Sequence, residues 1–251
     1  MDQQEHIKVI IREFRKRLLI ILGGKLHAAY VHGAAAFHDS LPTGDIDFHV
    51  ILEEPLTEPE KQALEDMHEA LAREYPPLGG ALDGYYILLE DAIKKTPPRS
   101  EMWANATDDA WALHREHMLA GCYIVLHGGD PKEICLPRSW PEIEAALLDQ
   151  IQYIAEHLEV YPDYCILNLC RLIYSFRTKD VVISKAKASE WALVAIPEWK
   201  WLVALARRSY ERKATSQDRA VMLREVKNFY AYAISQIDEA RSGFRAASSP
   251  K

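Results

Sequence analysis

Two acidic residues, separated by one position and preceded by a glycine turn, are the residues in this sequence best suited to chemistry. Asp45 and Asp47 enter the apolar run Ile46–Leu52, and Gly33 lies twelve residues before the first of them. Side chains at i and i+2 of a strand point to the same face, so the two carboxylates are expected to project together. Adjacent carboxylates repel unless a cation lies between them. Mg²⁺ takes such oxygen ligands together with substrate phosphates, so the pattern predicts a metal and phosphate site.

A third carboxylate, Asp83, opens another run that is typical of a strand, Asp83–Leu89. If this strand neighbours the first, three carboxylates meet at one sheet edge. Two would bind metal, and the third would bind metal or take a proton from an attacking hydroxyl. Phosphoryl and nucleotidyl transfer need little more than this positioning and charge neutralisation. The alternative is that Asp45 and Asp47 flank a turn and face water, since Asp is a common turn residue.

The elements that would position these residues follow from hydrophobic periodicity and from turn and cap signals. In the first half of the chain we predict helices over 5–22, from Thr57 to about Tyr75 and around Asp109–Leu119, and strands over Ala28–His32, Ile46–Leu52, Asp83–Leu89 and Gly121–His127. This order indicates a small mixed sheet with helices packed against it.

Strand signals are nearly absent from Pro141 onward. Helices are predicted at about 141–160, 163–178, 185–195, 197–211 and 216–241, with Asp163 and Ser184 as N-caps of the second and third. The expected fold class is α+β. A first domain over 1–138 would carry the sheet, and a second domain over 139–251 would be entirely helical.

Composition limits the partners and the compartment. The chain has 251 residues, 49% of them hydrophobic, and a net charge of −7. It has no long Lys/Arg run, so a nucleic-acid partner is not expected. The four cysteines form no C-x-x-C pair, which favours a reduced, cytoplasmic setting over a zinc or redox motif. The apolar patch Leu18–Leu22 is too short to span a membrane, and the N-terminus has no signal-peptide pattern, so no membrane association is expected.

Four histidines are candidates for binding metal or nucleotide. His114 and His117 stand at i and i+3 of a predicted helix, but no third ligand has a clear spacing, so two surface or capping histidines are favoured over a metal site. His32 and His49 lie close in sequence to the glycine turn and the Asp pair. They would reach a nucleotide, but ordinary strand positions are favoured.

Trp103, Asp108 and Asp109 are weak candidates for acceptor binding. Aromatic and acidic side chains can hold a polycationic sugar through cation–π and charge contacts. The same residues, with Trp111, are equally consistent with a helix start and packing tryptophans.

The glycine turn followed by D-x-D resembles the signature of the DNA polymerase β-like nucleotidyltransferase superfamily. More narrowly, the chain resembles the aminoglycoside adenylyltransferases that modify streptomycin and spectinomycin. The predicted helical domain shares this resemblance through Tyr164–Arg171 and Ser184–Leu193. The similarity covers roughly residues 20–240.

The resemblance implies transfer of AMP from ATP to a hydroxyl of a small, cationic, aminoglycoside-type acceptor, with Mg²⁺ as cofactor and release of pyrophosphate. It implies a cleft between the two domains for both substrates. By matching position, Asp45 and Asp47 hold the metal, and Asp83 falls where the family has a Glu general base that also adjoins the metal. Gly33 and Ala34 would meet the nucleotide from the first domain.

Arg171 and Lys185 fall where family members reach from the helical domain to the nucleotide phosphates. The helix spacing is compatible with this, because Asn168, Arg171 and Ser175 share one helix face and Arg and Lys suit phosphate oxygens. The alternative is an internal salt bridge for Arg171 and an exposed helix start for Lys185.

The chain departs from the family at three positions. Ala34 and Gly44 stand where the family has serines, and Asp83 is one methylene shorter than Glu. A serine hydroxyl bound to phosphate contributes about 1.5–3 kcal/mol. A second hypothesis is therefore a weakened or inactive nucleotidyltransferase fold that acts by binding nucleotide or protein, as in antitoxin-like members. A third is transfer onto a protein hydroxyl.

Overall fold

The computed structural model describes residues 3–39, 41, 44–94, 97–104 and 106–247, with side chains described as far as Gly243. The chain divides into two compact units. One comprises residues 1–38 and 42–142, and the other comprises residues 39–41 and 143–251. The division falls in the first turn of a helix. The two units are described separately below.

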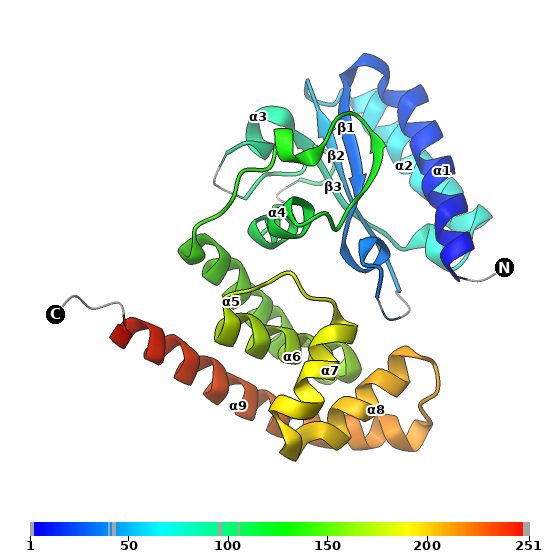
Figure 1. Cartoon of the computed structure of the whole chain (residues 1–251). Helices are drawn as coiled ribbons and strands as arrows, with labels where there is room; N and C mark the ends of the chain where they lie inside the picture. Colours follow the sequence, from blue (N-terminus) through cyan, green and yellow to red (C-terminus); the bar gives the residue numbers. More distant parts are fainter. Residues whose placement is uncertain (1–2, 40, 42–43, 95–96, 105, 248–251) are drawn as a thin grey trace. The chain divides into compact units, whose positions relative to one another are not determined.

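The first unit is built on a four-stranded sheet in the order β3-β2-β1-β4 (Figure 1). The strands are β1 (Leu26–Val31), β2 (Ile46–Leu52), β3 (Leu82–Leu88) and β4 (Ile124–His127). β1 pairs antiparallel with both β2 and β4, whereas β2 and β3 run parallel. The sheet is therefore mixed, as predicted, and its two central strands are β2 and β1.

The two faces of the sheet have different coverings. Phe48, Val50 and Tyr86 face a core formed with α1 (Gln3–Leu22) and α2 (Glu58–Glu74). Tyr30, Ile51 and Ile87 face a second core, closed by helices that follow β3. These are α3 (Leu89–Ala92) and α4 (Trp111–Leu119), which lie across the sheet from α1 and α2 in Figure 1. Since Asp47 alternates with Phe48, its side chain belongs to the face that α4 covers.

The second unit is helical. Its helices are α5 (Trp140–His157), α6 (Pro162–Thr178), α7 (Lys185–Ala195), α8 (Lys200–Tyr210) and α9 (Ser216–Ala247). α6 is the central helix: Cys165, Leu169 and Phe176 are fully buried on it, and it packs against α7, α8 and α9. Both units also contain short 3₁₀ helices. In the first unit they lie at Gly23–Lys25, Gly33–Ala36, Leu78–Gly80 and Pro131–Glu133, and in the second at Pro197–Trp199.

The α+β fold class is confirmed, and most predicted elements begin and end close to the observed ones. The last helix runs to Ala247 instead of ending at 241, and the short helix α3 was not predicted. Thr57 begins α2 through the predicted capping box, in which its backbone N–H donates to Glu60 at 2.7 Å. Ser184 caps α7 by accepting from the Lys187 N–H. Asp163 is not an N-cap, which corrects the prediction. Pro162 already occupies the first turn of α6, because its fixed φ and missing N–H suit that position.

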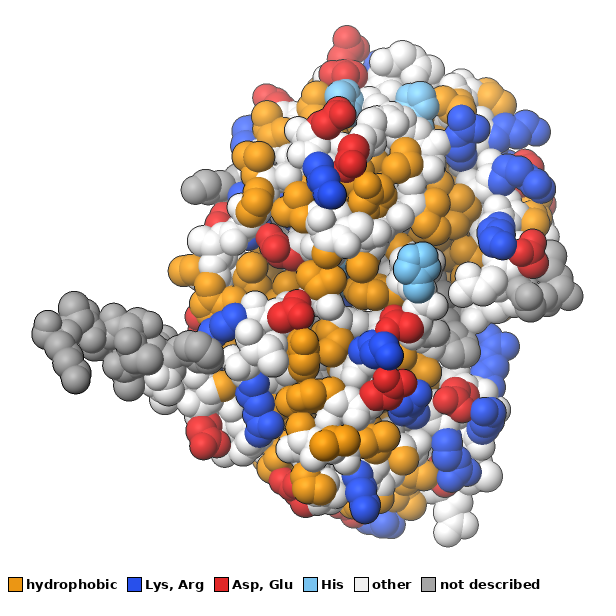
Figure 2. Space-filling model, in the orientation of Figure 1, with side chains coloured by type: hydrophobic (Ala, Val, Ile, Leu, Met, Phe, Trp, Pro, Cys, Tyr) orange, Lys and Arg blue, Asp and Glu red, His pale blue; other side chains and the backbone are white. Residues whose placement is uncertain are grey.

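Charge is distributed without a basic surface on the visible face. Lys and Arg side chains in Figure 2 are interspersed with Asp and Glu over both units. Among the described residues no helix is long and apolar enough to cross a membrane.

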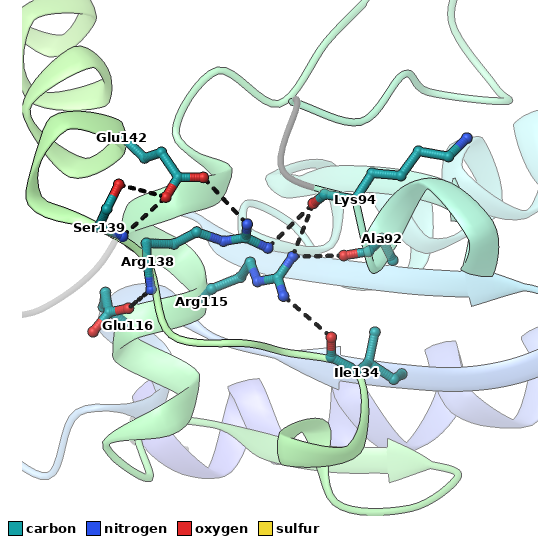
Figure 3. A network of polar contacts seen from close by, with 8 residues as sticks. All are labelled: Ala92, Lys94, Arg115, Glu116, Ile134, Arg138, Ser139 and Glu142. Carbon is teal, nitrogen blue, oxygen red and sulfur yellow. Dashed lines mark hydrogen bonds and ion pairs between the residues drawn. The ribbon is translucent and has the colours of Figure 1, made fainter.

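A buried arginine fixes α4 over the sheet (Figure 3). The Arg115 side chain is fully buried and donates to the carbonyls of Ala92, Lys94 and Ile134, at 2.7, 3.3 and 3.2 Å. Arg138 lies beside it, donating to the same Lys94 carbonyl and pairing with Glu142. Burial and the neighbouring Arg138 lower the pKa of Arg115 to about 10, so the guanidinium stays charged at neutral pH. α4 is thereby tied to the segments that flank it.

Replacing Arg115 by Met is expected to lower the free energy of unfolding by about 3 kcal/mol, because the buried carbonyls of Ala92 and Ile134 lose their charged donor. The matched control is Arg12→Met. Its side chain is 72% exposed, and the change should cost no more than about 0.5 kcal/mol. Urea unfolding of both variants measures the difference. Equal stabilities would show that Arg115 does not anchor α4.

Candidate active site

The three predicted carboxylates lie together at one edge of the sheet. Asp47 stands directly opposite Asp83 in the parallel register of β2 and β3. Asp45 precedes β2 by one residue and shares the face of Asp47. Asp45 and Asp47 are half-buried, and Asp83 is exposed. The geometry expected from the strand periodicity is therefore present.

Gly33 allows the turn to approach this edge. Its backbone has φ +62°, and a Cβ atom placed there would lie 1.7 Å from Oδ2 of Asp47. Only glycine has both the left-handed conformation and the missing side chain that this approach requires. The preceding residue ties the turn to β2, since the His32 N–H donates to the Asp47 carbonyl at 3.0 Å. Ala34 follows in the same 3₁₀ turn and is half-buried.

The local electrostatics fit a divalent cation. The pKa of Asp83 is raised by partial burial and by the Asp45 carboxylate nearby, which shows that these groups repel one another when ionised. A cation between them would relieve that repulsion, and carboxylate oxygens are the donors that Mg²⁺ prefers. The donor set of Asp45, Asp47 and Asp83 therefore fits the metal that the sequence implied.

Arg171 and Lys185, the predicted phosphate-binding residues of the helical unit, both lie at α6. Arg171 is part of this helix, and Lys185 contacts its residue Tyr164. Arg171 is half-buried and donates to Oδ1 of Asn168 at 3.2 Å. Lys185 begins α7 with its ammonium 4.7 Å from the ring centre of Tyr164 and 5.2 Å from that of Tyr210. Asn168 in turn donates to the Tyr164 carbonyl. Lys185 thus lies over the Tyr164 ring, and Arg171 is linked to the Tyr164 carbonyl through Asn168.

Two of the three candidates for acceptor binding occupy other positions. Asp108 is buried, and its carboxylate accepts from His49 and His114, so it offers no charge to an acceptor. Trp103 packs near Tyr86, on the sheet face opposite to Asp83. Neither position favours a contact with an acceptor at the carboxylate edge. Asp109 is exposed and accepts from the Thr107 hydroxyl at 2.9 Å, which leaves its assignment a prediction.

The histidines also differ from expectation. His117 is 4% exposed and His114 is half-buried, so neither is a surface residue. His32 and His49 occupy the expected positions at the end of β1 and within β2, but their rings stack at 4.2 Å and meet His114 from α4. Sequence reasoning weighed these residues in separate pairs. The sequence offered one signal for this cluster: His49 follows Asp47 by two residues in a strand, which places both side chains on the same face of the sheet.

A polar hollow of about 440 Å³ lies elsewhere in the first unit. It is lined by Glu58, Lys61 and Gln62 of α2 and by Ser100 and Met102. It contains none of the predicted site residues, and it lies on the side of α2, away from the carboxylate edge.

Comparisons with known proteins agree with this arrangement. Residues 140–236 match the family described as the C-terminal domain of aminoglycoside adenylyltransferase. A spectinomycin 9-adenylyltransferase of Enterococcus faecalis is 21% identical over 230 residues, which cover 83% of this chain and 86% of the relative. The chain is therefore similar to aminoglycoside adenylyltransferases, and these matches support the predicted family and the predicted enzyme class, a nucleotidyltransferase.

A solved structure shares the fold of this adenylyltransferase-like chain. The crystal structure of a spectinomycin adenyltransferase from Enterococcus, with ATP and spectinomycin, superposes with a TM-score of 0.70 at 19% identity. The match covers 89% of this chain and 99% of the other. It supports the α+β architecture of a sheet-bearing unit and a helical unit.

Gly33→Ala is expected to weaken binding of Mg²⁺-ATP roughly tenfold or more, because the new Cβ displaces the Asp47 carboxylate. This size corresponds to the loss of one charged contact. Gly44→Ala is the matched control, since a Cβ atom there meets nothing within 4 Å. Isothermal titration of ATP in the presence of Mg²⁺ compares the two. Unchanged binding by the Gly33 variant would contradict the role given to this turn.

Proposed function

We propose that the chain transfers AMP from ATP to a hydroxyl group of a small cationic acceptor of the aminoglycoside type, with release of pyrophosphate. The observation that carries the proposal is the meeting of Asp45, Asp47 and Asp83 at one sheet edge, against the Gly33 turn. The relatives' activity on spectinomycin supports this acceptor class. The function is assigned to the cytoplasm, in keeping with the cysteine usage.

In this proposal the first unit holds the reacting phosphate. Asp45 and Asp47 would bind Mg²⁺, with Asp83 next to it, and the metal when bound neutralises phosphate charge. The backbone N–H groups of the Gly33–Ala36 turn are available to phosphate oxygens, which replaces in part the serine hydroxyl that Ala34 lacks. Arg171 and Lys185 are assigned to the nucleotide phosphates from the helical unit.

Asp83 is assigned the proton transfer. The acceptor oxygen bonds to the α-phosphorus of ATP, and the bond from that phosphorus to the bridging oxygen of pyrophosphate breaks. The hydroxyl proton passes to the Asp83 carboxylate, whose exposure leaves it accessible to an acceptor. Its raised pKa makes it a stronger base than an ordinary Asp.

The proposal is tested by measuring pyrophosphate release from ATP and Mg²⁺ with spectinomycin, streptomycin and other aminoglycosides in turn. We expect release with at least one acceptor and a mass gain of one AMP on it. Chelation of the metal should abolish both signals. Release without an acceptor, or label on protein instead of on a small molecule, would contradict the proposed acceptor class.

Asp47→Asn should reduce turnover with that acceptor by at least about 100-fold, because a metal ligand on the reacting phosphate is lost. Asp66→Asn is the matched control, an exposed carboxylate on α2 that should leave the rate unchanged. Initial rates of pyrophosphate release provide the readout. Full activity in the Asp47 variant would remove the D-x-D pair from the mechanism.

The second hypothesis is a protein that binds nucleotide without transferring it. The pyrophosphate assay together with thermal melting distinguishes it from the first. It predicts that ATP and Mg²⁺ raise the melting temperature, although no acceptor yields pyrophosphate. The departures at Ala34 and Asp83 are the observations that favour it.

A further inference from the structure

Three histidines from separate segments converge beneath the carboxylate edge. His32 follows β1, His49 lies in β2, and His114 lies in α4. One ring nitrogen of each lies within 4.8 Å of the others. In a tetrahedral zinc site with Zn–N distances of about 2.0–2.1 Å, ligand nitrogens are separated by about 3.3 Å. To share one ion, the three nitrogens must move closer together, and the stacked His32 and His49 rings, whose planes meet at 21°, must turn relative to each other.

Asp108 orients two of the three rings. Its Oδ2 lies 2.8 Å from Nε2 of His49 and 3.0 Å from Nδ1 of His114. Burial opposes ionisation of this carboxyl, but His114 and His49 hold its pKa well below the ordinary value. An ionised carboxylate only accepts, so both facing nitrogens carry protons. In neutral rings the other nitrogen, Nδ1 of His49 and Nε2 of His114, is then the unprotonated one.

This arrangement is typical of the second shell in metalloproteins, where a ligating histidine donates its other N–H to a carboxylate. It fixes both the tautomer and the ring direction. Asp108 therefore acts on the cluster as a positioning residue.

His32 is the feature that a purely structural account leaves unexplained. It is 2% exposed, and neither of its ring nitrogens has a hydrogen-bond partner. The Phe48 backbone is near enough to affect its pKa, but no hydrogen bond of standard geometry joins them. Nδ1 of His49 is buried without a partner as well. Buried polar atoms are normally satisfied, so unpartnered ring nitrogens on two stacked histidines point to a ligand that would satisfy them.

We propose that His32, His49 and His114 form a binding site for one transition-metal ion of the Zn²⁺ class. The fourth position is left to water or to a bound molecule, and the half-buried His114 provides the way in. The ligand set differs in kind from the carboxylate edge. Imidazole nitrogens favour Zn²⁺, Co²⁺, Ni²⁺ and Cu²⁺, whereas Mg²⁺ favours oxygen ligands.

The two ligand sets are neighbours on the same sheet face. His49 follows Asp47 by two residues, and the His32 N–H is bonded to the Asp47 carbonyl. Arg115, next to His114 in α4, holds that helix in place through the carbonyls shown in Figure 3. The histidine site is thus built on the same rigid elements as the carboxylate site. It does not depend on the proposed transfer reaction.

The test uses Co²⁺ as a spectroscopic probe on the full, chelator-treated chain in the presence of Mg²⁺. We expect one Co²⁺ per chain, with the visible ligand-field bands of a four-coordinate ion that has three imidazole ligands. One equivalent of Zn²⁺ should displace it. Excess Mg²⁺ should leave the bands unchanged. A chain that binds no Co²⁺, or bands that Mg²⁺ removes, would overturn the proposal.

The decisive variant is His32→Phe, which keeps a stacked ring and removes both nitrogens. Its melting temperature without metal should equal or exceed that of the wild type, whereas Co²⁺ affinity should fall at least about 100-fold. Asp108→Asn should weaken binding about 10- to 100-fold, the range found for second-shell residues. Wild-type affinity in the folded His32 variant would refute the site.

Two controls identify the site that binds. His68→Gln removes a half-buried histidine of the same unit that bonds Tyr86 and lies outside the cluster, so Co²⁺ binding should be unchanged. Asp47→Asn should also leave the Co²⁺ bands intact while it affects nucleotide transfer. Loss of the bands in the Asp47 variant would assign the ion to the carboxylate edge and overturn the proposal.

Discussion

The parallel register of β2 and β3 is the constraint on which the site depends. It sets Asp47 opposite Asp83 and leaves Asp45 on the same face, so three carboxylates crowd one sheet edge. Partial burial and the nearby Asp45 carboxylate raise the pKa of Asp83, and a cation between the carboxylates would relieve their repulsion. The Gly33 turn must pass within van der Waals reach of Asp47, which excludes every side chain at that position. One strand pairing therefore brings together the proposed metal ligands and the proposed base, and the turn after β1 closes over them.

Periodicity predicted much of this, because its signals are local. The i, i+2 spacing of Asp45 and Asp47 and the apolar run after them were enough to place both carboxylates on one face. The capping box at Thr57 and the Ser184 cap were read in the same way, from residues within one turn. Asp163 was wrongly predicted to be the N-cap of α6. Pro162 is equally suited to the first turn of a helix, and α6 begins at Pro162, one residue before Asp163.

The remaining assignments required contacts between distant segments. Asp108 was a weak candidate for acceptor binding, because nothing near it in sequence shows that His49 and His114 enclose it. Trp103 was placed with the acceptor although the sheet separates it from Asp83. The histidine cluster needs the β1–β2 register, the α4 position and the Arg115 anchor together. One sheet face thus carries oxygen ligands at its edge and nitrogen ligands below, and each set selects a different class of metal.

The most direct test of the central claim is an anomalous diffraction measurement on crystals of the chain grown with ATP and Mn²⁺ in place of Mg²⁺. The account predicts a manganese peak about 2.1 Å from carboxylate oxygens of Asp45 and Asp47, in contact with the nucleotide phosphates. Bound ATP with no manganese at these carboxylates, or a manganese ion held only elsewhere in the chain, would contradict it.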